Sequence, residues 1–567
     1  MQVWRIDVRN QELRREPVPE AWTRLGGRGL TARVLLDESD PRCNPLGPGN
    51  KLIFAPGLLA GQTLSSCDRL SAGGKSPLTG GVKESNAGGT TGLTMARLGL
   101  KALIIEGGPA STGLWVLRLN RQGASFDPAD DLTGLGVYES ASRLLRRYGR
   151  KAAMAIIGPA GEAGLAAAGV LNLDKDLVPS RIAARGGLGA VMGSKGLKAV
   201  VFDATGCSNP PIADEASFRA ARSAYIKALL EHPQTAVYRD YGTAAMAHMC
   251  DAFGGLPTRN FSAGHFEGVD RISGETLREL LLKRGGESTP THACMPGCVI
   301  RCSNIFGDDK GRAVVSALEY ETIGLMGSNL GIDSLDVIAR LNRLVNDLGL
   351  DSIELGAALG VAAEAGLMKW GDGERALALL EEVRLGTPLG RALGDGATAA
   401  GRALGVNRVP AVKGQAMSAY EPRAIKGTGV TYATSPQGAD HTAGLTIRAR
   451  IDHLDPKGQV EASRAAQVNM AGYDTLGVCI FAAFGFTAAP QGTIARLLRA
   501  RYGWDVPDDI LQVLGKETLR LEREFNRRAG FTAKDDRIPE FMTREPLPPH
   551  GSVFDVPEAE LDRIFEF

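Results

Sequence analysis

The chain has 567 residues, enough for roughly two to four domains with large cores, and its 65 lysine and arginine residues nearly balance 64 aspartate and glutamate residues. Because the net charge is near zero and no basic block is present, nucleic acid is not an expected partner. No run of about eighteen apolar residues occurs and the first residues lack signal-peptide features, so we expect no membrane span and a reducing cytoplasm as the location.

Residues 1–206 are predicted to form a β-rich domain. The opening MQVWRIDVRN alternates apolar and polar residues as an edge or hairpin strand does. Further strands are predicted at residues 51–59, 101–108, 114–126 and 197–204, with a hairpin turn at Gln122-Gly123. Residues 207–213 are polar and proline-bearing and are predicted to be a linker. No internal repeat of fixed period is found.

From Asp214 onward the apolar residues recur every three to four positions, which predicts helices. These helices are expected at residues 214–232, 273–284, 333–349, 352–366, 373–385, 493–503 and 508–530. Asp214, Ser273 and Asp333 are the expected N-caps. We therefore predict an α+β protein in which the β-rich N-terminal domain, 1–206, precedes two mainly α-helical domains, 207–404 and 405–567.

Two glycine-rich runs in the first domain combine cations with bare backbone amides. They are DRLSAGGKSPLTGGVKESNAGG at 68–89 and SRIAARGGLGAVMGSKGLK at 180–198. Amides beside arginine bind anions, and phosphate is the usual anion. The spacing matches neither the dinucleotide fingerprint nor the P-loop, so tight turns in a compact sheet explain either run alone equally well. The presence of two such runs favours a large phosphorylated ligand.

Four of the eight cysteines form a three-plus-one pattern, namely Cys294, Cys298, Cys302 and the remote Cys479. A cubane iron–sulfur cluster needs one thiolate for each iron, and a tight loop can supply three but rarely four. A structural zinc site would use two close pairs, and unrelated buried cysteines are the other alternative. Disulfides are not expected, because the remaining cysteines are scattered and nothing marks the chain as secreted.

Two single residues are candidates for proton transfer. Glu321 lies with Glu319 in ALEYETIGLMGSNLGID, soon after Cys302, and a carboxylate near a redox centre can take up a proton. A helix cap or a salt bridge is the alternative for either glutamate. His441 lies in a loop of small residues, YATSPQGADHTAG, where it either meets a ligand or is structural.

A pair of related hexads completes the pattern. NDLGLD spans 346–351, and DTLGVC spans 474–479 and ends on the proposed fourth cluster ligand, Cys479. Carboxylates at the ends of such short turns can bind the amino and ring N–H donors of a heterocycle. The second hexad would therefore connect that ligand directly to the cluster.

Together these segments resemble the aldehyde ferredoxin oxidoreductase family, tungsten- or molybdenum-dependent enzymes with a bis-pyranopterin cofactor. The matching runs cover essentially the whole chain: LGGRGL at 25–30, GGKSPLTGGVKESNAGG at 73–89, RGGLGAVMGSKGLKAVV at 185–201, LPTRNF at 256–261, EYETIGLMGSNLGID at 319–333, YATSPQGADH at 432–441 and the Cys479 hexad. The resemblance implies a cofactor at the interface of the three domains, its metal held by pterin dithiolenes rather than by protein side chains.

By the same resemblance the enzyme oxidises a small aldehyde to a carboxylic acid. Electrons would leave through one 4Fe–4S cluster to ferredoxin or to a ferredoxin-like iron–sulfur subunit, with the chain in a homodimer or a hetero-oligomer. Two alternatives stay open. One is the tungsten-containing reductase subunit of an aromatic acyl-CoA reductase, and the other is a cluster-only electron-transfer or scaffold subunit.

The resemblance also implies roles for individual positions. Glu321 and His441 would handle protons beside the metal, and Cys294, Cys298, Cys302 and Cys479 would bind the cluster. A magnesium ion bridging the pterin phosphates would contact Asn86 and a backbone carbonyl near Gly186. The cofactor-binding positions are Arg69, Asn86, Ala87, Gly88, Arg181, Arg185, Gly186, Gly187, Asn346, Leu350, Asp351, Gln437, Asp474 and Val478.

The sequence departs from the family pattern at four places. The cluster loop has C-x3-C-x3-C spacing, whereas C-x2-C-x3-C is usual in the family, so one residue must be looped out. Asn346 stands where aspartate is typical, Gln437 where arginine is common, and Ala443 where lysine is common. Losing two cations near the second pterin would change its electrostatics.

Overall fold

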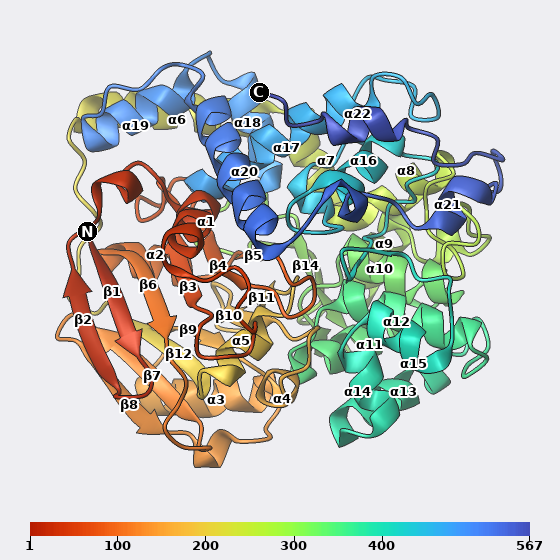
Figure 1. Cartoon of the computed structure of the whole chain (residues 1–567), viewed down its shortest axis with the longest axis horizontal. Helices are drawn as coiled ribbons and strands as arrows, with labels where there is room; N and C mark the ends of the chain where they lie inside the picture. The colour runs from red at the N-terminus through yellow and green to blue at the C-terminus, as the bar shows by residue number, and fades with distance from the viewer.

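The computed structural model describes residues 1–567. Its N-terminal part contains two six-stranded sheets (Figure 1). The first has the order β2-β1-β6-β3-β4-β5, with strands Glu12–Glu16, Gln2–Asp7, Leu100–Glu106, Leu52–Pro56, Leu70–Lys75 and Val82–Ala87. The second has the order β8-β7-β12-β9-β10-β11, with strands Ala124–Pro128, Trp115–Asn120, Leu197–Asp203, Ala153–Ile156, Val170–Leu173 and Pro179–Ala183. Both sheets contribute to one apolar core, in which the rings of Phe54 and Phe202 lie 6.5 Å apart.

The two sheets share a single topology. In each sheet, the first two strands along the chain form a hairpin at one edge. The last strand along the chain, β6 or β12, pairs parallel to the first hairpin strand, and the other pairs are antiparallel. A long helix follows each hairpin, α1 (Gly27–Glu38) and α3 (Val137–Tyr148). A short one precedes each parallel strand, α2 (Thr91–Arg97) and α5 (Leu188–Ser194). The domain is therefore duplicated in its fold, although connections of unequal length leave no repeat of fixed period in the sequence.

Helices make up most of the remaining chain. After the small α4 (Pro159–Glu162) of the first domain, they are α6 (Glu215–Glu231), α7 (Pro233–Tyr241), α8 (Met246–Ala252), α9 (Gly274–Arg284), α10 (Tyr320–Met326), α11 (Leu335–Leu348), α12 (Ser352–Glu364), α13 (Gly373–Leu385), α14 (Pro388–Gly394), α15 (Ala397–Leu404), α16 (Lys426–Thr434), α17 (Gln459–Leu476), α18 (Ala483–Ala488), α19 (Thr493–Tyr502), α20 (Ile510–Ala529), α21 (Glu540–Arg544) and α22 (Glu558–Asp562). Two small sheets are formed by β13 (Thr289–His292), β14 (Ser303–Gly307) and β15 (Ala313–Val315), and by β16 (Ala411–Val412) and β17 (Gln415–Ala416). The predicted α+β class, a β-rich domain followed by helical parts, is confirmed.

Local signals located most elements correctly. The predicted turn at Gln122-Gly123 joins β7 to β8, and the side chains of Asp214 and Ser273 cap α6 and α9. The cap predicted at Asp333 is wrong by one residue, because the hydroxyl of Ser334 accepts from the backbone N–H of Val337 instead.

The helical cores do not follow the chain order. The buried face of α6, which includes Phe218, Tyr225 and Leu229, shares a core with α1 and α17–α20. Figure 1 accordingly shows α6 beside α19 and α18. Side chains of α16, α21 and α22 belong instead to the core of α8–α15. The boundary between 207–404 and 405–567 stays a prediction.

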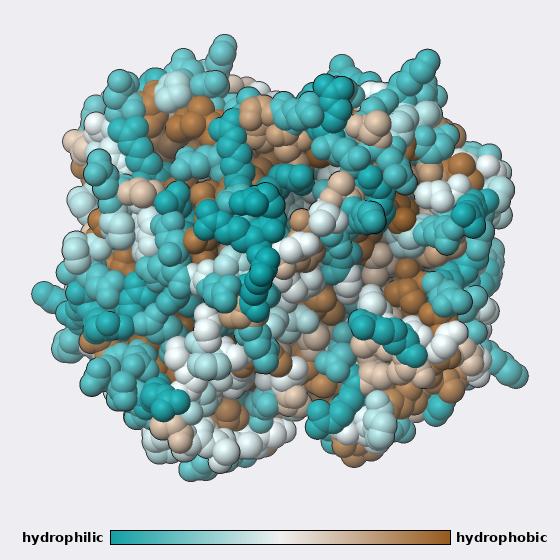
Figure 2. All heavy atoms as spheres, viewed as in Figure 1, coloured by the Kyte–Doolittle hydropathy of each residue, from teal (hydrophilic) through white to brown (hydrophobic).

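The surface is mostly polar, with apolar side chains in small separate patches on the face shown in Figure 2. No single helix is long and apolar enough to cross a membrane. By length and composition alone, one broken pair, Gln459–Leu476 with Ile480–Ala488, passes that test with a bend of 107°.

Two glycines bring the sheets into backbone contact with the helical part. Gly57 lies beyond the end of β3, and a Cβ added there would come within 2.1 Å of the amide nitrogen of Gly477. Gly158 lies beyond the end of β9, the equivalent strand, and a Cβ there would come within 2.3 Å of the carbonyl oxygen of Leu348. Both hexads are therefore packed against equivalent strand ends of the duplicated domain.

We expect Gly57→Ala and Gly158→Ala each to destabilise the fold by about 1–3 kcal/mol, because backbone atoms cannot move aside as flexible side chains do. Thermal unfolding followed by circular dichroism measures the change. Gly113→Ala is the matched control, since its Cβ would meet only Ser111 Oγ at 4.0 Å. Midpoints equal to that of the control would contradict the packing argument.

Candidate active site

A cavity of about 370 Å³ lies where the two sheets meet the helices, and 37 residues line it. That volume is typical of sites that enclose a small organic ligand. Most of the predicted site residues are on its wall: Arg69, Asn86, Ala87, Gly88, Arg181, Arg185, Cys294, Cys302, Glu321, Asn346, Asp351, His441, Asp474 and Cys479. The sequence had placed these residues in seven separate segments, and the fold brings them to one space.

One wall of the cavity is formed by the edge strands β5 and β11, which occupy equivalent positions in the two sheets. Arg69 donates to the side chain of Asn86 through Nε and to its backbone carbonyl, at 3.2 Å, through Nη2. A Cβ on Gly88 would lie 3.2 Å from Cys294 Sγ and 3.7 Å from Arg69 Nη1. On the other strand, Arg181 Nη1 lies 3.6 Å from Glu319 Oε1. This wall therefore combines arginine side chains with glycine backbone that no side chain covers.

Gly186 and Gly187 do not line the cavity. Their φ angles of +82° and +78° form the turn that starts α5. The carbonyl oxygen of Gly186 accepts a hydrogen bond of 2.7 Å from Ser76 Oγ. These two glycines shape the loop that carries Arg185, and the Gly186 oxygen already has a partner.

Three more predicted contacts lie behind the wall. The amides of Leu350 and Val478 donate to the carbonyls of Val345 and Tyr473, at 3.0 and 2.9 Å, and so close the ends of α11 and α17. Gln437 Nε2 donates to Glu522 Oε1 at 2.7 Å, inside a buried network that includes Arg28. These residues hold the wall in place rather than form it.

Arg185 has two acidic partners, Asp351 on the cavity wall and Glu354. Its Nε lies 2.9 Å from Asp351 Oδ2, although the alignment does not make a hydrogen bond and both atoms lack another partner. Its Nη2 lies 3.8 Å from Glu354 Oε2. Burial, only partly offset by Arg185, raises the pKa of Glu354 to about 7. An orphaned donor and acceptor at a cavity wall indicate room for a polar ligand.

His441 and Glu321 meet at the cavity. His441 Nε2 lies 3.2 Å from Glu321 Oε1, and its Nδ1 lies 2.8 Å from Ser418 Oγ. Arg185 Nη1 donates to the same Ser418 oxygen at 3.1 Å, so the serine proton is free to point at Nδ1. In the neutral imidazole the proton therefore resides on Nε2, facing Glu321.

A buried ion pair stands directly behind the histidine. Lys83 Nζ lies 2.8 Å from Asp440 Oδ2, and both side chains are almost fully enclosed. Burial opposes ionisation of Asp440, but Lys83, Arg185 and His441 more than offset it and lower its pKa well below 3.8. Asp440 therefore stays ionised and fixes a negative charge next to His441.

The four thiols of the three-plus-one pattern gather at one end of the cavity. Cys294, Cys302 and Cys479 line it, and Cys298 Sγ accepts a hydrogen bond of 3.3 Å from Ser66 Oγ. The amide of Cys479 donates to the carbonyl of Ser66 at 2.8 Å, so one serine connects both cysteine segments. No three His, Cys, Asp or Glu side chains converge closely enough to hold a single ion. A cubane needs wider spacing, because each thiolate binds a different iron.

The additional residue of the C-x3-C-x3-C loop is accommodated in a turn. The amide of Cys298 donates to the carbonyl of Met295 at 3.4 Å, and Gly297 has a φ angle of +73°. This turn takes up the extra length, and Cys294 keeps its place on the cavity wall.

Sequence reasoning missed several residues that support the site. Lys83 and Asp440 are 357 positions apart, and Ser418 and Glu354 lie in segments without any motif. Ser65 and Ser66 lie just before the first glycine-rich run, which starts at residue 68. Their closeness to that run was the only signal in the sequence that could have pointed to them.

Comparisons with known proteins agree along the whole chain. A family model described as aldehyde ferredoxin oxidoreductase, N-terminal domain, matches residues 3–204, and one described as domains 2 & 3 matches residues 220–566. The tungsten-containing aldehyde ferredoxin oxidoreductase of Thermococcus kodakarensis is 32% identical over 561 residues, covering 94% of this chain and 89% of the relative. An aliphatic sulfonate oxidoreductase, WOR-like subunit, of Pyrococcus furiosus is 27% identical over 574 residues, covering 92% of this chain and 85% of the relative.

Among solved structures, the active site complex BamBC of benzoyl coenzyme A reductase, in complex with 1,5-dienoyl-CoA, contains a similar chain. The TM-score is 0.78 at 20% identity, over 95% of this chain and 90% of that one. This likeness establishes the fold.

Lys83→Met should destabilise the protein by about 3–5 kcal/mol, because it leaves Asp440 buried without its principal cation. Lys83→Met/Asp440→Asn should recover much of that loss. Since the fold lowers the pKa of Asp440 from 3.8, the stabilisation is complete at neutral pH and is lost only below that value. Unfolding in urea at pH 7 measures both variants. Lys175→Met, which removes an exposed pair, is the control and should cost less than about 1 kcal/mol; an equal cost would contradict the prediction.

Proposed function

Because the chain belongs to the aldehyde ferredoxin oxidoreductase family, we propose that it is a tungsten-dependent enzyme that oxidises an aldehyde to a carboxylic acid. It is an oxidoreductase of that type. The observation that carries the proposal is the pairing of His441 with Glu321 in the same cavity as the arginine-lined edge strands and the cysteine thiols.

The cavity wall fits a bis-pterin cofactor. Arg69 and Arg185 would hold the pterin phosphates, and Asn86 would contact a bridging magnesium ion. The orphaned Asp351 Oδ2 and the carboxylate of Asp474 would accept from the pterin N–H groups. Gly186 would contribute the shape of the loop, and its carbonyl oxygen, which accepts from Ser76, keeps a second lone pair for the magnesium ion.

The gathered thiols fit a 4Fe–4S cluster. Burial, together with the neighbouring Cys298, raises the pKa of Cys294 to about 12, so this thiol would be neutral without iron. Iron coordination would deprotonate it outright, and the metal charge would offset the cost of burying a thiolate. Ser66 would donate to the Cys298 sulfur, a contact that raises the potential of a cluster.

Bound tungsten would supply the two-electron redox chemistry. The balanced reaction is aldehyde plus water to carboxylic acid, two protons and two electrons, so the residues must handle protons. His441 Nε2–H would donate to the substrate oxygen or to Glu321, whose Oε2 accepts from the amide of Ala419 at 2.8 Å. Ser418, held by Arg185, would keep the imidazole in that tautomer. Glu321 would then pass protons out of the cavity.

A second candidate is a reductive reaction of a different substrate, the reduction of an aromatic acyl-CoA, which the likeness to the benzoyl-CoA reductase complex favours. The same residues would then deliver protons instead of removing them. Assays of the purified protein with aldehydes and an oxidised viologen, and with benzoyl-CoA and a reduced viologen, separate the two. Activity in the second assay alone would overturn the aldehyde proposal.

Replacing His441 with asparagine should lower kcat about 10²–10⁴-fold, the usual range for loss of a general acid–base. Tungsten content should not change, because no metal ligand is removed. The matched control is His265→Asn, an exposed histidine paired with Asp251. Full aldehyde oxidation by the His441 variant would remove this residue from the mechanism.

Elemental analysis of anaerobically purified protein should give about one tungsten and about four irons per chain. Cys479→Ala should lose the visible absorbance of the cluster, whereas Cys207→Ala in the linker should keep it. Iron without tungsten or molybdenum would favour the cluster-only subunit. Retained colour in the Cys479 variant would refute that ligand assignment.

A further inference from the structure

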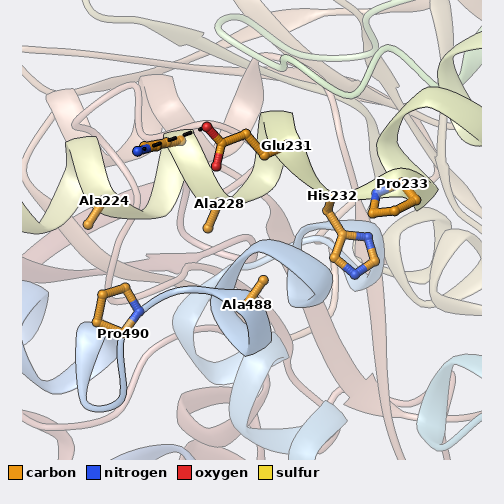
Figure 3. Close-up of a pocket in the computed structure, with 8 residues that line it drawn as sticks. Ala224, Ala228, Glu231, His232, Pro233, Ala488 and Pro490 are labelled. Carbon is orange, nitrogen blue, oxygen red and sulfur yellow. Dashed lines mark ion pairs between the residues drawn. The ribbon is translucent and has the colours of Figure 1, made fainter.

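The exposed face of α6 borders a continuous groove. Seven residues at helical spacing line its first part: Arg219, Arg222, Ser223, Ile226, Lys227, Leu230 and Glu231. The second part shares Lys227 and Glu231 and is closed by His232, Pro233, Ala488 and Pro490. Figure 3 shows Ala224 and Ala228 on the side of α6 that faces Ala488 and Pro490. In Figure 2 an apolar patch interrupts the polar surface where Figure 1 places α19 and α6.

The groove carries net positive charge beside apolar surface. Arg219 and Arg222 form no ion pair, and the only acid that lines the groove, Glu231, faces Lys227 at 4.0 Å. Leu230 stands between these charges with 56% of its surface exposed. An apolar centre with unpaired cations around it is typical of a surface that binds an acidic protein.

The opposite face of α6 contacts the cluster loop. The hydroxyl of Tyr225 donates to the carbonyl of Ser65 at 2.9 Å, and Ser65 Oγ accepts from the amide of Val299 at 3.1 Å. Its neighbour Ser66 donates to Cys298 Sγ. Tyr225 and the Ser65–Ser66 segment therefore connect this face of α6 to the loop that carries Cys298.

Aromatic rings fill the space between the thiols and the groove. Tyr225 stacks on Phe486 of α18 at 4.0 Å, and α18 begins four residues after Cys479. His232, at the groove, stacks on Phe484 at 5.2 Å, and Tyr238 contacts Phe481 at 4.5 Å on the wall of the cavity. Dense packing without voids favours electron transfer, since the electronic coupling falls more steeply across gaps than through packed atoms.

We propose that this groove docks a small acidic iron–sulfur protein, which takes electrons from the enzyme. The inference rests on the proposed function. In each encounter the reduced cluster of this chain gives one electron to an oxidised cluster of the carrier, so two encounters complete one aldehyde turnover. The cations of α6 steer the acidic carrier, which makes association dependent on ionic strength.

The test uses the whole enzyme with two electron acceptors, an acidic two-cluster ferredoxin and benzyl viologen. Arg219→Glu/Arg222→Glu should lower kcat/KM for the ferredoxin at least about 10-fold at low salt and flatten its salt dependence. The viologen rate should not change. Arg9→Glu/Arg121→Glu, in the two hairpin turns of the sheets and likewise without ion pairs, is the matched control and should leave both rates unchanged.

The wild-type enzyme gives a second measurement that needs no variant. A zero-length carbodiimide should cross-link Lys227, whose side chain is 75% exposed, to ferredoxin carboxylates, and mass spectrometry identifies the site. Unchanged ferredoxin kinetics in the α6 variant, or cross-links confined to other faces, would overturn the proposal. A change of oligomeric state without a kinetic effect would assign the groove to a second copy and also overturn it. Absence of viologen-linked aldehyde oxidation in the wild type would refute the proposed function itself.

Discussion

The close approach of backbone to backbone at two glycine pairs determines the geometry of the cavity. Gly57 meets Gly477, and Gly158 meets Gly349. In each pair a strand end of the duplicated domain abuts the left-handed glycine that ends a helix. Because no side chain separates the two backbones, the residues at both ends of each hexad are fixed relative to the edge strands. Asp351 and Asp474 therefore face the same space from opposite sides.

This enclosure explains why so many charges in and around the cavity are paired. Arg28 with Glu522, Lys83 with Asp440, and Arg185 with Asp351 are all nearly inaccessible to water. Buried ions contribute little net stability, but they fix dipoles and charges before a ligand arrives. Burial also raises the pKa of Asp474 to about 6, even though Arg28 opposes it. The wall is thus preorganised for a polar ligand at some cost in stability.

Sequence reasoning was reliable where the determining contacts are local. The Gln122-Gly123 turn and the cap at Asp214 depend on residues within a few positions. Asp333 was misjudged because Ser334, its neighbour, caps equally well. The grouping of the cysteines was predicted from their three-plus-one spacing, and the gathering of the motifs followed from family resemblance. The Lys83–Asp440 pair and the Ser76 contact with Gly186 could not be predicted, because packing alone brings such distant segments together.

The two halves of the proposed site are not equivalent, although they pack against duplicated sheets. The two hexads occupy equivalent turns, and their last residues differ: Asp351 begins α12, whereas Cys479 precedes the short helix Ile480–Ala482 that leads into α18. Equivalent positions thus carry a carboxylate on one side and a thiol on the other. If both sides held a pterin, only one could adjoin a cluster, so electrons would leave in one direction. That side is the one covered by α18 and α6, which places the exit of the electrons at the surface where the unpaired arginines lie.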